Sequence, residues 1–249
     1  MITLDIHTIK TTIMKKILLY NLFLFLIACS SDDVTNTAVL PEIETPISGL
    51  KIKQVEGDNI TQYFYNKNGF IDSISFIGEN IVAEKFVYNN INQIIEKRYA
   101  SKKASDTEYS IYNITYFAYN NKKQIMHFKT YNKNNALASQ QSLTYNEDGS
   151  LYNPTQIVKD GNLVQQNASQ ISTIFTFDTN PNPFYNIYPK AYCTAFYINK
   201  NNITSQKTTT PYYTNFYEYQ LKYNSEKFII EKINHNNPAN SHLSKYYYY

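Results

Sequence analysis

The sequence predicts an all-β fold, an antiparallel meander of repeated β-hairpins that forms a curved sheet or an open barrel. Three observations support this prediction: short runs alternate between apolar and polar residues, turns rich in Asn and Gly separate the runs, and a Tyr-Asn unit recurs along the chain. No apolar stripe of helical period and convincing length is visible. Turns this short join antiparallel neighbours, so consecutive strands are expected to pair.

Length and charge exclude several classes of protein. The chain has 249 residues, which is enough to bury a core without disulfides, and it contains only two Cys. With 23 basic and 20 acidic residues, its formal net charge is +3. A charge this small over this length forms no basic stripe, so no nucleic-acid partner is expected.

The first 28 residues read as a signal peptide. A positive start at residues 14–16 (Met-Lys-Lys) precedes an apolar run at 17–28, which is too short to cross a bilayer. We therefore expect residues 1–28 to be removed and Met14 to be the true start. Residues 26–29 (Leu-Ile-Ala-Cys) resemble a bacterial lipoprotein box, which implies that Cys29 carries lipid and anchors the mature chain in a membrane.

The residues after Cys29 predict where the mature chain is tethered. Residues 30–33 (Ser-Ser-Asp-Asp) resemble the export tag that carries lipoproteins of the Bacteroidetes to the outer face of the outer membrane. This resemblance implies the cell surface, with the periplasmic face as the alternative. Residues 29–48, with two Pro and no periodicity, are expected to be a flexible linker, and residues 49–249 a single β-hairpin-repeat domain.

The alternation within residues 49–249 marks individual strands. Four runs are explicit and are expected to be strands, at 60–65, 70–76, 81–88 and 111–119. The turns between the first of them fall at 66–69, 78–80 and 89–92, where Asn and Gly tolerate the positive φ of tight hairpins.

The recurring unit is Tyr-Asn, four further residues and then an apolar residue. Five full copies begin at Tyr65, Tyr88, Tyr119, Tyr145 and Tyr223, and a degenerate copy lies at Phe177-Asp178. In each copy we expect the aromatic residue to close a strand, Asn to initiate the turn and the apolar residue to open the return strand. One such hairpin is unstable alone, so each needs its neighbours.

Two family resemblances rest on these residues. The Tyr-Asn units are similar to the tyrosine-aspartate (YD) repeats of RHS-type proteins, although Asn stands where those repeats have Asp. Residues 175–184 (Phe-Thr-Phe-Asp-Thr-Asn-Pro-Asn-Pro-Phe) look like a signature of uncharacterised Bacteroidetes lipoproteins of the DUF4595 kind, as do an Asn-rich stretch at 199–203 and an aromatic end at 245–249. The resemblance covers about residues 50 to 249 and implies little about function.

Prolines interrupt the strand pattern after residue 178. Because Pro cannot donate to a sheet ladder, residues 178–190 are expected to be an ordered loop. Its aromatic side chains are expected to form a hydrophobic plug, with a cap over an open end of the sheet as the alternative. Cys193 lies in the aromatic run that follows and is expected to be a half-buried thiol on a strand.

The sequence predicts no catalytic or metal site. The four His lack the spacing of a zinc site, and no nucleophile elbow, phosphate loop or dinucleotide fingerprint is present. We therefore expect neither an enzyme nor a cofactor. A hydrolase with two carboxylates that meet only in space is the alternative, because sequence spacing does not reveal such a pair.

The leading functional hypothesis is a lipid-anchored, non-catalytic module of the cell envelope that binds a surface ligand or has a structural role. Loops at sheet ends commonly carry recognition. The candidate contacts to a glycan or surface protein are accordingly Tyr185, Tyr188, Tyr212, Tyr213 and Phe216. A different alternative is a periplasmic carrier of lipids or lipoproteins that uses a concave aromatic face as an apolar cradle.

Overall fold

The computed structural model describes residues 43–46, 49–234 and 242–249. The predicted signal peptide, Cys29 and the export tag lie outside these residues. Among the described residues the chain is almost entirely β, as the sequence predicts, with strands in an antiparallel meander. The strands expected at 60–65, 70–76, 81–88 and 111–119 are present, and each observed boundary agrees to within one residue.

The first ten strands run from the N-terminal side to the middle of the chain. They are β1 (Ile52–Glu56), β2 (Ile60–Tyr65), β3 (Ile71–Ile77), β4 (Asn80–Tyr88), β5 (Ile94–Lys103), β6 (Ser110–Tyr119), β7 (Ile125–Asn132), β8 (Leu137–Ser142), β9 (Thr144–Tyr145) and β10 (Leu151–Tyr152). The remaining elements are β11 (Gln156–Lys159), β12 (Asn162–Ala168), β13 (Ile171–Pro181), the 3-10 turn η1 (Tyr185–Ile187), α2 (Lys190–Ala195), β14 (Asn201–Thr209), β15 (Thr214–Tyr223), β16 (Ile229–Asn234) and β17 (His242–Tyr248).

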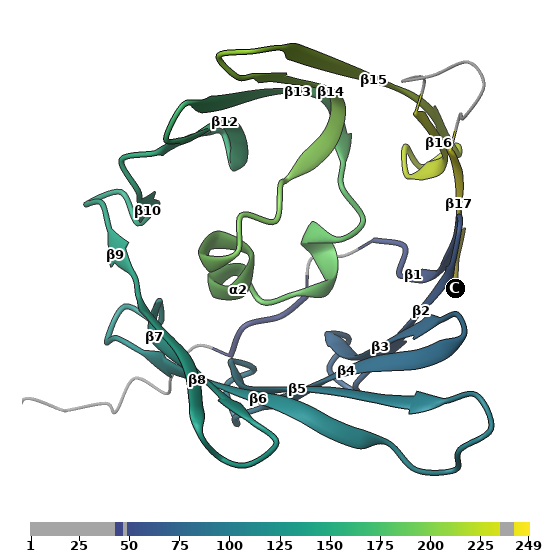
Figure 1. The fold of residues 1–249 in the computed structure, drawn as a ribbon, viewed down its shortest axis with the longest axis vertical. Coiled ribbons are helices and arrows are strands. Elements are labelled where there is room, and N and C mark those ends of the chain that lie inside the picture. The colour runs from purple at the N-terminus through teal and green to yellow at the C-terminus, as the bar shows by residue number, and fades with distance from the viewer. Residues whose placement is uncertain (1–42, 47–48, 235–241) are drawn as a thin grey trace, which may run out of the picture. The chain divides into compact units, whose positions relative to one another are not determined.

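Fifteen of these strands form one sheet in the order β11 to β17 followed by β1 to β8. The first and last strands are therefore neighbours: Ile52 lies opposite Tyr248, and the amide of Tyr249 donates to the carbonyl of Lys51 at 3.0 Å. The sheet curls around a central segment (Figure 1). It is not closed, because β8 and β11 are its two ends and the separate β9–β10 hairpin lies between them in the chain.

The tyrosines of four repeat units, together with Tyr248 of β17, form a series of equivalent hydrogen bonds. In each case the phenol hydroxyl donates to the carbonyl oxygen of the Ile that opens a neighbouring strand. The pairs are Tyr65 with Ile52, Tyr88 with Ile71, Tyr119 with Ile94, Tyr145 with Ile125, and Tyr248 with Ile229. We call these five tyrosines the tyrosine ladder. It ties successive hairpins together beyond the backbone hydrogen bonds of the sheet. The fifth repeat tyrosine, Tyr223, donates to the Asp178 carboxylate instead.

The Asn of each unit organises the turn. At Asn66, for example, the side-chain oxygen accepts from the amides of Asn68 and Phe70, at 2.9 and 3.2 Å, while its own amide donates to the carbonyl of Phe70 at 2.9 Å. The fifth position of every unit has positive φ: 89° at Gly69, 66° at Asn92, 62° at Lys123, 83° at Gly149 and 67° at Lys227. Three units therefore hold a non-Gly residue in a backbone conformation that Gly adopts more readily.

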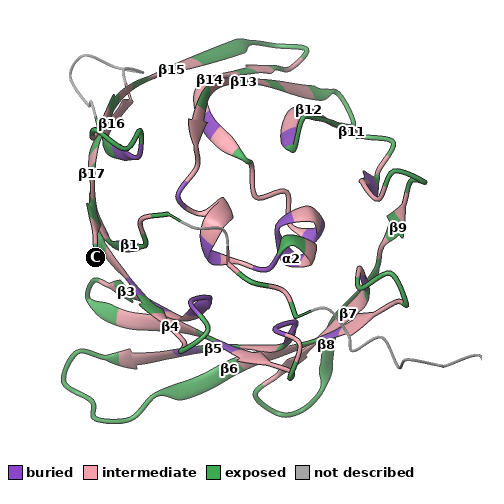
Figure 2. Cartoon of the chain, turned by 180° about the vertical axis from the view of Figure 1, so that it is seen from behind, coloured by how far each residue is buried: buried purple, intermediate pink, exposed green. Residues whose placement is uncertain are grey.

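The central segment corrects the bounds of the loop predicted at 178–190 and supports the hydrophobic plug rather than a cap over an open end of the sheet. Strand β13 continues to Pro181, and residues 182–199, here called the inner segment, then lie on the concave side of the sheet (Figures 1 and 2). Ile187, Tyr192 and Ala195 of this segment belong to the main core cluster together with Phe86 and Phe117 of the sheet. The apolar side chains are thus buried against the concave face, and that face is a packed core rather than an empty cradle.

Two further expectations are wrong. Cys193 is fully buried on α2, not half-buried on a strand, because Pro189 starts a helical turn at this point. A helix of six residues is too short to show a helical period in the sequence.

The degenerate copy at Phe177-Asp178 forms no hairpin turn either, since it lies inside β13. There the Asp178 carboxylate accepts from the amides of Asn180 and Asn202, each at 3.1 Å, and from the Tyr223 hydroxyl. Asp178 therefore joins β13 to β14 and β15.

Candidate functional site

The five residues predicted to contact a ligand fall in two separate places. Tyr212, Tyr213 and Phe216 lie on the hairpin that joins β14 to β15. Tyr185 and Tyr188 belong to the inner segment. They were predicted together because all five lie near the same irregular region of the sequence. In the fold, the long β13–β14 and β14–β15 pairs separate the two groups.

The β14–β15 hairpin presents its aromatic side chains to solvent. The exposed fractions are 91% for Tyr212, 56% for Tyr213 and 59% for Phe216. Thr210 shapes the turn, because its hydroxyl accepts from the amides of Tyr212 and Tyr213 at 3.3 and 3.1 Å and its own amide donates to the Tyr213 carbonyl at 2.9 Å. We call Tyr212, Tyr213 and Phe216 the aromatic hairpin.

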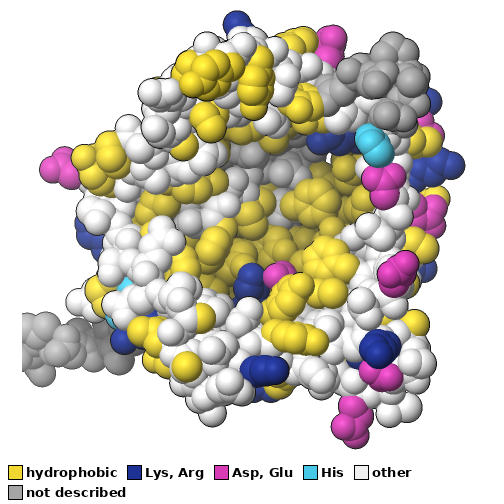
Figure 3. Space-filling model, in the orientation of Figure 1, with side chains coloured by type: hydrophobic (Ala, Val, Ile, Leu, Met, Phe, Trp, Pro, Cys, Tyr) yellow, Lys and Arg dark blue, Asp and Glu magenta, His cyan; other side chains and the backbone are white. Residues whose placement is uncertain are grey.

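The surface beside the aromatic hairpin is also partly apolar. Phe216 lies opposite Lys207 of β14, which lies opposite Ile174 of β13, so the three side chains share one face of the sheet. Ile174 and Phe216 are both exposed. Hydrophobic side chains gather over β14 and β15 at the top of the view in Figure 3. This group is open to solvent, so its rings are accessible to a ligand.

Tyr188 serves the core rather than a surface. Its ring stacks on Tyr192, with centroids 5.1 Å apart and an interplanar angle of 19°, and meets the edge of Phe86 at 5.7 Å. Burial raises the pKa of the Tyr188 phenol above its usual range. Tyr185 is half-buried, and burial raises its pKa as well. Both side chains line a cavity.

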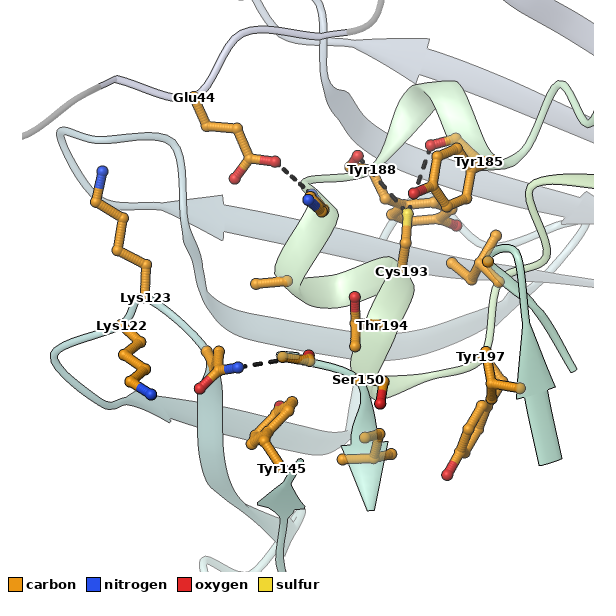
Figure 4. Close-up of a pocket in the computed structure, with 18 of the residues that line it drawn as sticks. Glu44, Lys122, Lys123, Tyr145, Ser150, Tyr185, Tyr188, Cys193, Thr194 and Tyr197 are labelled. Carbon is orange, nitrogen blue, oxygen red and sulfur yellow. Dashed lines mark hydrogen bonds between the residues drawn. The ribbon is translucent and has the colours of Figure 1, made fainter. Parts of the chain in front are cut away.

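This cavity of about 770 Å³ lies where the large sheet is interrupted, and we call it the seam cavity. Four parts of the chain surround it: the β6–β7 turn, the β9–β10 hairpin, the β11–β12 hairpin and the inner segment. Residues 43–45, which precede β1, also line it. In Figure 4, Lys122 and Lys123 lie on one side and Tyr185, Tyr188 and Cys193 on the other. Figure 3 shows a hollowed face whose floor is hydrophobic.

The inner wall of the seam cavity is neutral. Burial raises the pKa of Tyr145 to about 12 and raises the pKa of the Cys193 thiol well above its usual range. The Cys193 thiol lies 3.4 Å from the carbonyl oxygen of Tyr185, to which it donates. This wall therefore offers rings, aliphatic groups and uncharged donors, and the buried thiol is not activated as a nucleophile.

Charged groups lie at the rim of the seam cavity. The Glu44 carboxylate accepts from the amide of Lys190, and desolvation raises its pKa. The Asp148 carboxylate accepts from the hydroxyl and the amide of Ser150, at 2.6 and 2.9 Å, and these two hydrogen bonds lower its pKa. The lysines of the rim are Lys122, Lys123 and Lys190.

Sequence reasoning missed Glu44, Lys122, Lys190 and Tyr145 as members of one site. They come from segments far apart in the chain, and each has an ordinary local setting: a linker end, a turn, a helix start and a repeat tyrosine. Within the described residues, no group of three or more His, Cys, Asp or Glu side chains is placed to hold a metal ion. No helix in the same part of the chain is long and apolar enough to cross a membrane.

Comparison with known proteins identifies no family for this chain. No family model matches the chain, and no curated protein matches it. Among solved structures, a porin-like protein from Bacteroides uniformis is similar with a TM-score of 0.47 and 13% identity, over 80% of this chain and 95% of that one. A porin-like protein from Bacteroides vulgatus has a TM-score of 0.24 and 10% identity, over 80% and 87% of the two chains. Neither carries an argument about function.

Proposed function

We propose that this chain is a lipid-anchored protein of the outer membrane that faces the cell exterior and acts as a non-catalytic glycan-binding module. The observation that carries the proposal is the aromatic hairpin, in which Tyr212, Tyr213 and Phe216 are all more than half exposed. Aromatic rings stack on the apolar faces of sugars, and phenol hydroxyls can bond to sugar hydroxyls. Large exposed aromatic groups in a soluble domain commonly mark an interaction site.

The tether supports the location. Cys29 follows an apolar run and precedes β1, which begins at Ile52. The 22 residues between these positions can span up to about 80 Å when extended. A lipid on Cys29 would therefore hold the β domain at the membrane and leave the aromatic hairpin free to meet ligands in solution or on a neighbouring surface.

The proposal is tested by glycan binding of the mature chain, residues 29–249, carrying Cys29→Ala and produced without its signal peptide, so that it bears no lipid. We expect saturable binding to a cell-surface polysaccharide, weakened about tenfold or more by Tyr212→Ala combined with Tyr213→Ala, because central aromatic contacts dominate such interfaces. Tyr152→Ala is the matched control, since Tyr152 is 56% exposed and lies on β10.

The urea midpoint of the double variant should equal that of the parent, because both side chains are exposed. Equal glycan binding by the double variant and the parent would refute the aromatic hairpin as the site. If the chain binds a surface protein and no glycan, the ligand is a protein and the proposal of glycan binding is wrong.

A further inference from the structure

The seam cavity is an opening that the fold itself creates. Strands β10 and β11 follow one another in the chain but are not paired, because β10 pairs only with β9 and β11 only with β12. The sheet therefore has a gap at this point, behind which the inner segment forms a wall. The cavity of about 770 Å³ lies within the usual range for one small ligand.

The lining of the seam cavity has an apolar part and a polar part. Its apolar part consists of side chains from the β9–β10 hairpin, the β11–β12 hairpin and the inner segment, namely Tyr145, Leu151, Val158, Leu163 and Ile198. Leu151 is a buried core residue, so this part reaches the interior. The polar part is the rim, where Lys122, Lys123 and Lys190 stand near Glu44 and Asp148.

The rim is suited to an anion. Both carboxylates already accept hydrogen bonds from the chain: Asp148 from Ser150, and Glu44 from the Lys190 amide. The ammonium of Lys122 forms no ion pair with any of the described residues and is exposed. A negative ligand group at the rim would gain charge-assisted hydrogen bonds from lysine without displacing an existing salt bridge of Lys122.

We infer that the seam cavity binds a single-chain amphiphile with an anionic head, namely a long-chain carboxylate. The alkyl chain lies against the apolar part of the lining, which includes Leu151 and Leu163. The carboxylate lies at the rim beside Lys122. The site is separate from the aromatic hairpin, so this inference goes beyond the proposed glycan binding and does not depend on it.

The test measures binding of oleate and of oleyl alcohol to the mature Cys29→Ala chain without detergent. We expect saturable binding of both, with oleate tighter. Lys122→Gln should weaken oleate roughly two- to fivefold, the range of exposed ion pairs, and leave oleyl alcohol unchanged. Lys133→Gln is the matched control, because Lys133 is an exposed lysine in the β7–β8 turn and does not line the cavity.

A second variant fills the cavity. Thr194 lies on α2 and lines the cavity, so Thr194→Phe should weaken both ligands about tenfold or more through steric exclusion. Ser139→Phe adds the same ring to β8 at an exposed position and should change neither affinity.

Photocrosslinking locates the alkyl chain independently of whether Thr194→Phe folds. A fatty acid with a photoreactive group in its chain should label peptides from residues 145–163 and 185–199. Labelling confined to other peptides, equal affinity for oleate and the alcohol, or full affinity in a folded Thr194→Phe chain would overturn the inference. Tyr212→Ala with Tyr213→Ala should leave oleate binding intact, which separates this result from a failure of glycan binding.

Discussion

Replacing Tyr119 by phenylalanine removes one hydrogen bond of the tyrosine ladder and keeps the ring. The Tyr119 hydroxyl donates to the carbonyl of Ile94 at 2.8 Å, and Ile94 is fully buried. Burial raises the pKa of Tyr119, so its phenol remains a protonated donor at neutral pH. The variant therefore leaves a carbonyl in the core without this donor, while the packing of the aromatic ring is unchanged.

The size of the effect follows from the cost of an unmade hydrogen bond. Loss of one buried partner destabilises a protein by about 1–3 kcal/mol. With a urea m-value of about 2–3 kcal/mol/M, the unfolding midpoint should fall by roughly 0.3–1.5 M and the m-value should not change. Urea unfolding followed by circular dichroism measures both quantities.

Tyr116→Phe is the matched control, three residues away on the same strand. Tyr116 is 45% exposed, and its hydroxyl forms no hydrogen bond within the described part of the chain. Loss of the Tyr116 hydroxyl should change the free energy of unfolding by less than about 0.5 kcal/mol. If Tyr119→Phe and Tyr116→Phe cost the same, the ladder makes no special contribution to stability and the reasoning is refuted.

Three other predictions follow from the same geometry. Lys227→Gly should raise the free energy of unfolding by about 0.5–1 kcal/mol, because Lys227 holds a φ of 67° that glycine adopts without strain; a lower melting temperature would contradict this. Cys193 is buried on α2, so a thiol reagent should label it only after urea unfolds the chain, and rapid labelling of the native protein would contradict its placement. Burial raises the pKa of Tyr145 and of Tyr246 to about 12, so their contribution to stability is complete below pH 10 and is lost as the pH rises towards 12. Urea midpoints that do not change between pH 9 and 11.5 would argue against this burial.

The hairpins were predictable because their signals are local. Tyr65, Asn66 and Ile71 specify a strand end, a turn and a strand start within seven residues, and the structure confirms each role. Units without Gly at the fifth position form the same turn, since Asn92 and Lys123 adopt the positive φ that the turn requires. What repeats in the sequence repeats in the structure as a hydrogen-bonded unit.

The inner segment and the pairing of the first strand with the last were not predictable in this way. Helix α2 spans only six residues, and its burial depends on contacts of Tyr192 with Phe86 and Phe117 from distant strands. The pairing of β1 with β17 also joins opposite ends of the domain. Such contacts leave no period in the sequence.

Of the two candidate sites, the aromatic hairpin could be predicted from local sequence and the seam cavity could not. Exposure of Tyr212 and Tyr213 follows from a short hairpin after Pro211, which local sequence can indicate. The seam cavity exists only because three hairpin turns and the inner segment meet beside a gap in the sheet. Glu44 and Lys122 have no shared pattern by which a reader of the sequence could place them together.

The most direct test of the surface-binding proposal is protease accessibility on intact cells. An epitope beside Tyr249 reports whether the domain is cut, and a Cys29→Ala chain controls for anchoring by lipid. We predict that protease added to whole cells removes the epitope from the lipidated chain and leaves it on the Cys29→Ala chain, which cannot be acylated and carried to the surface. Protection of the lipidated chain until the outer membrane is opened would contradict surface exposure and place the domain in the periplasm.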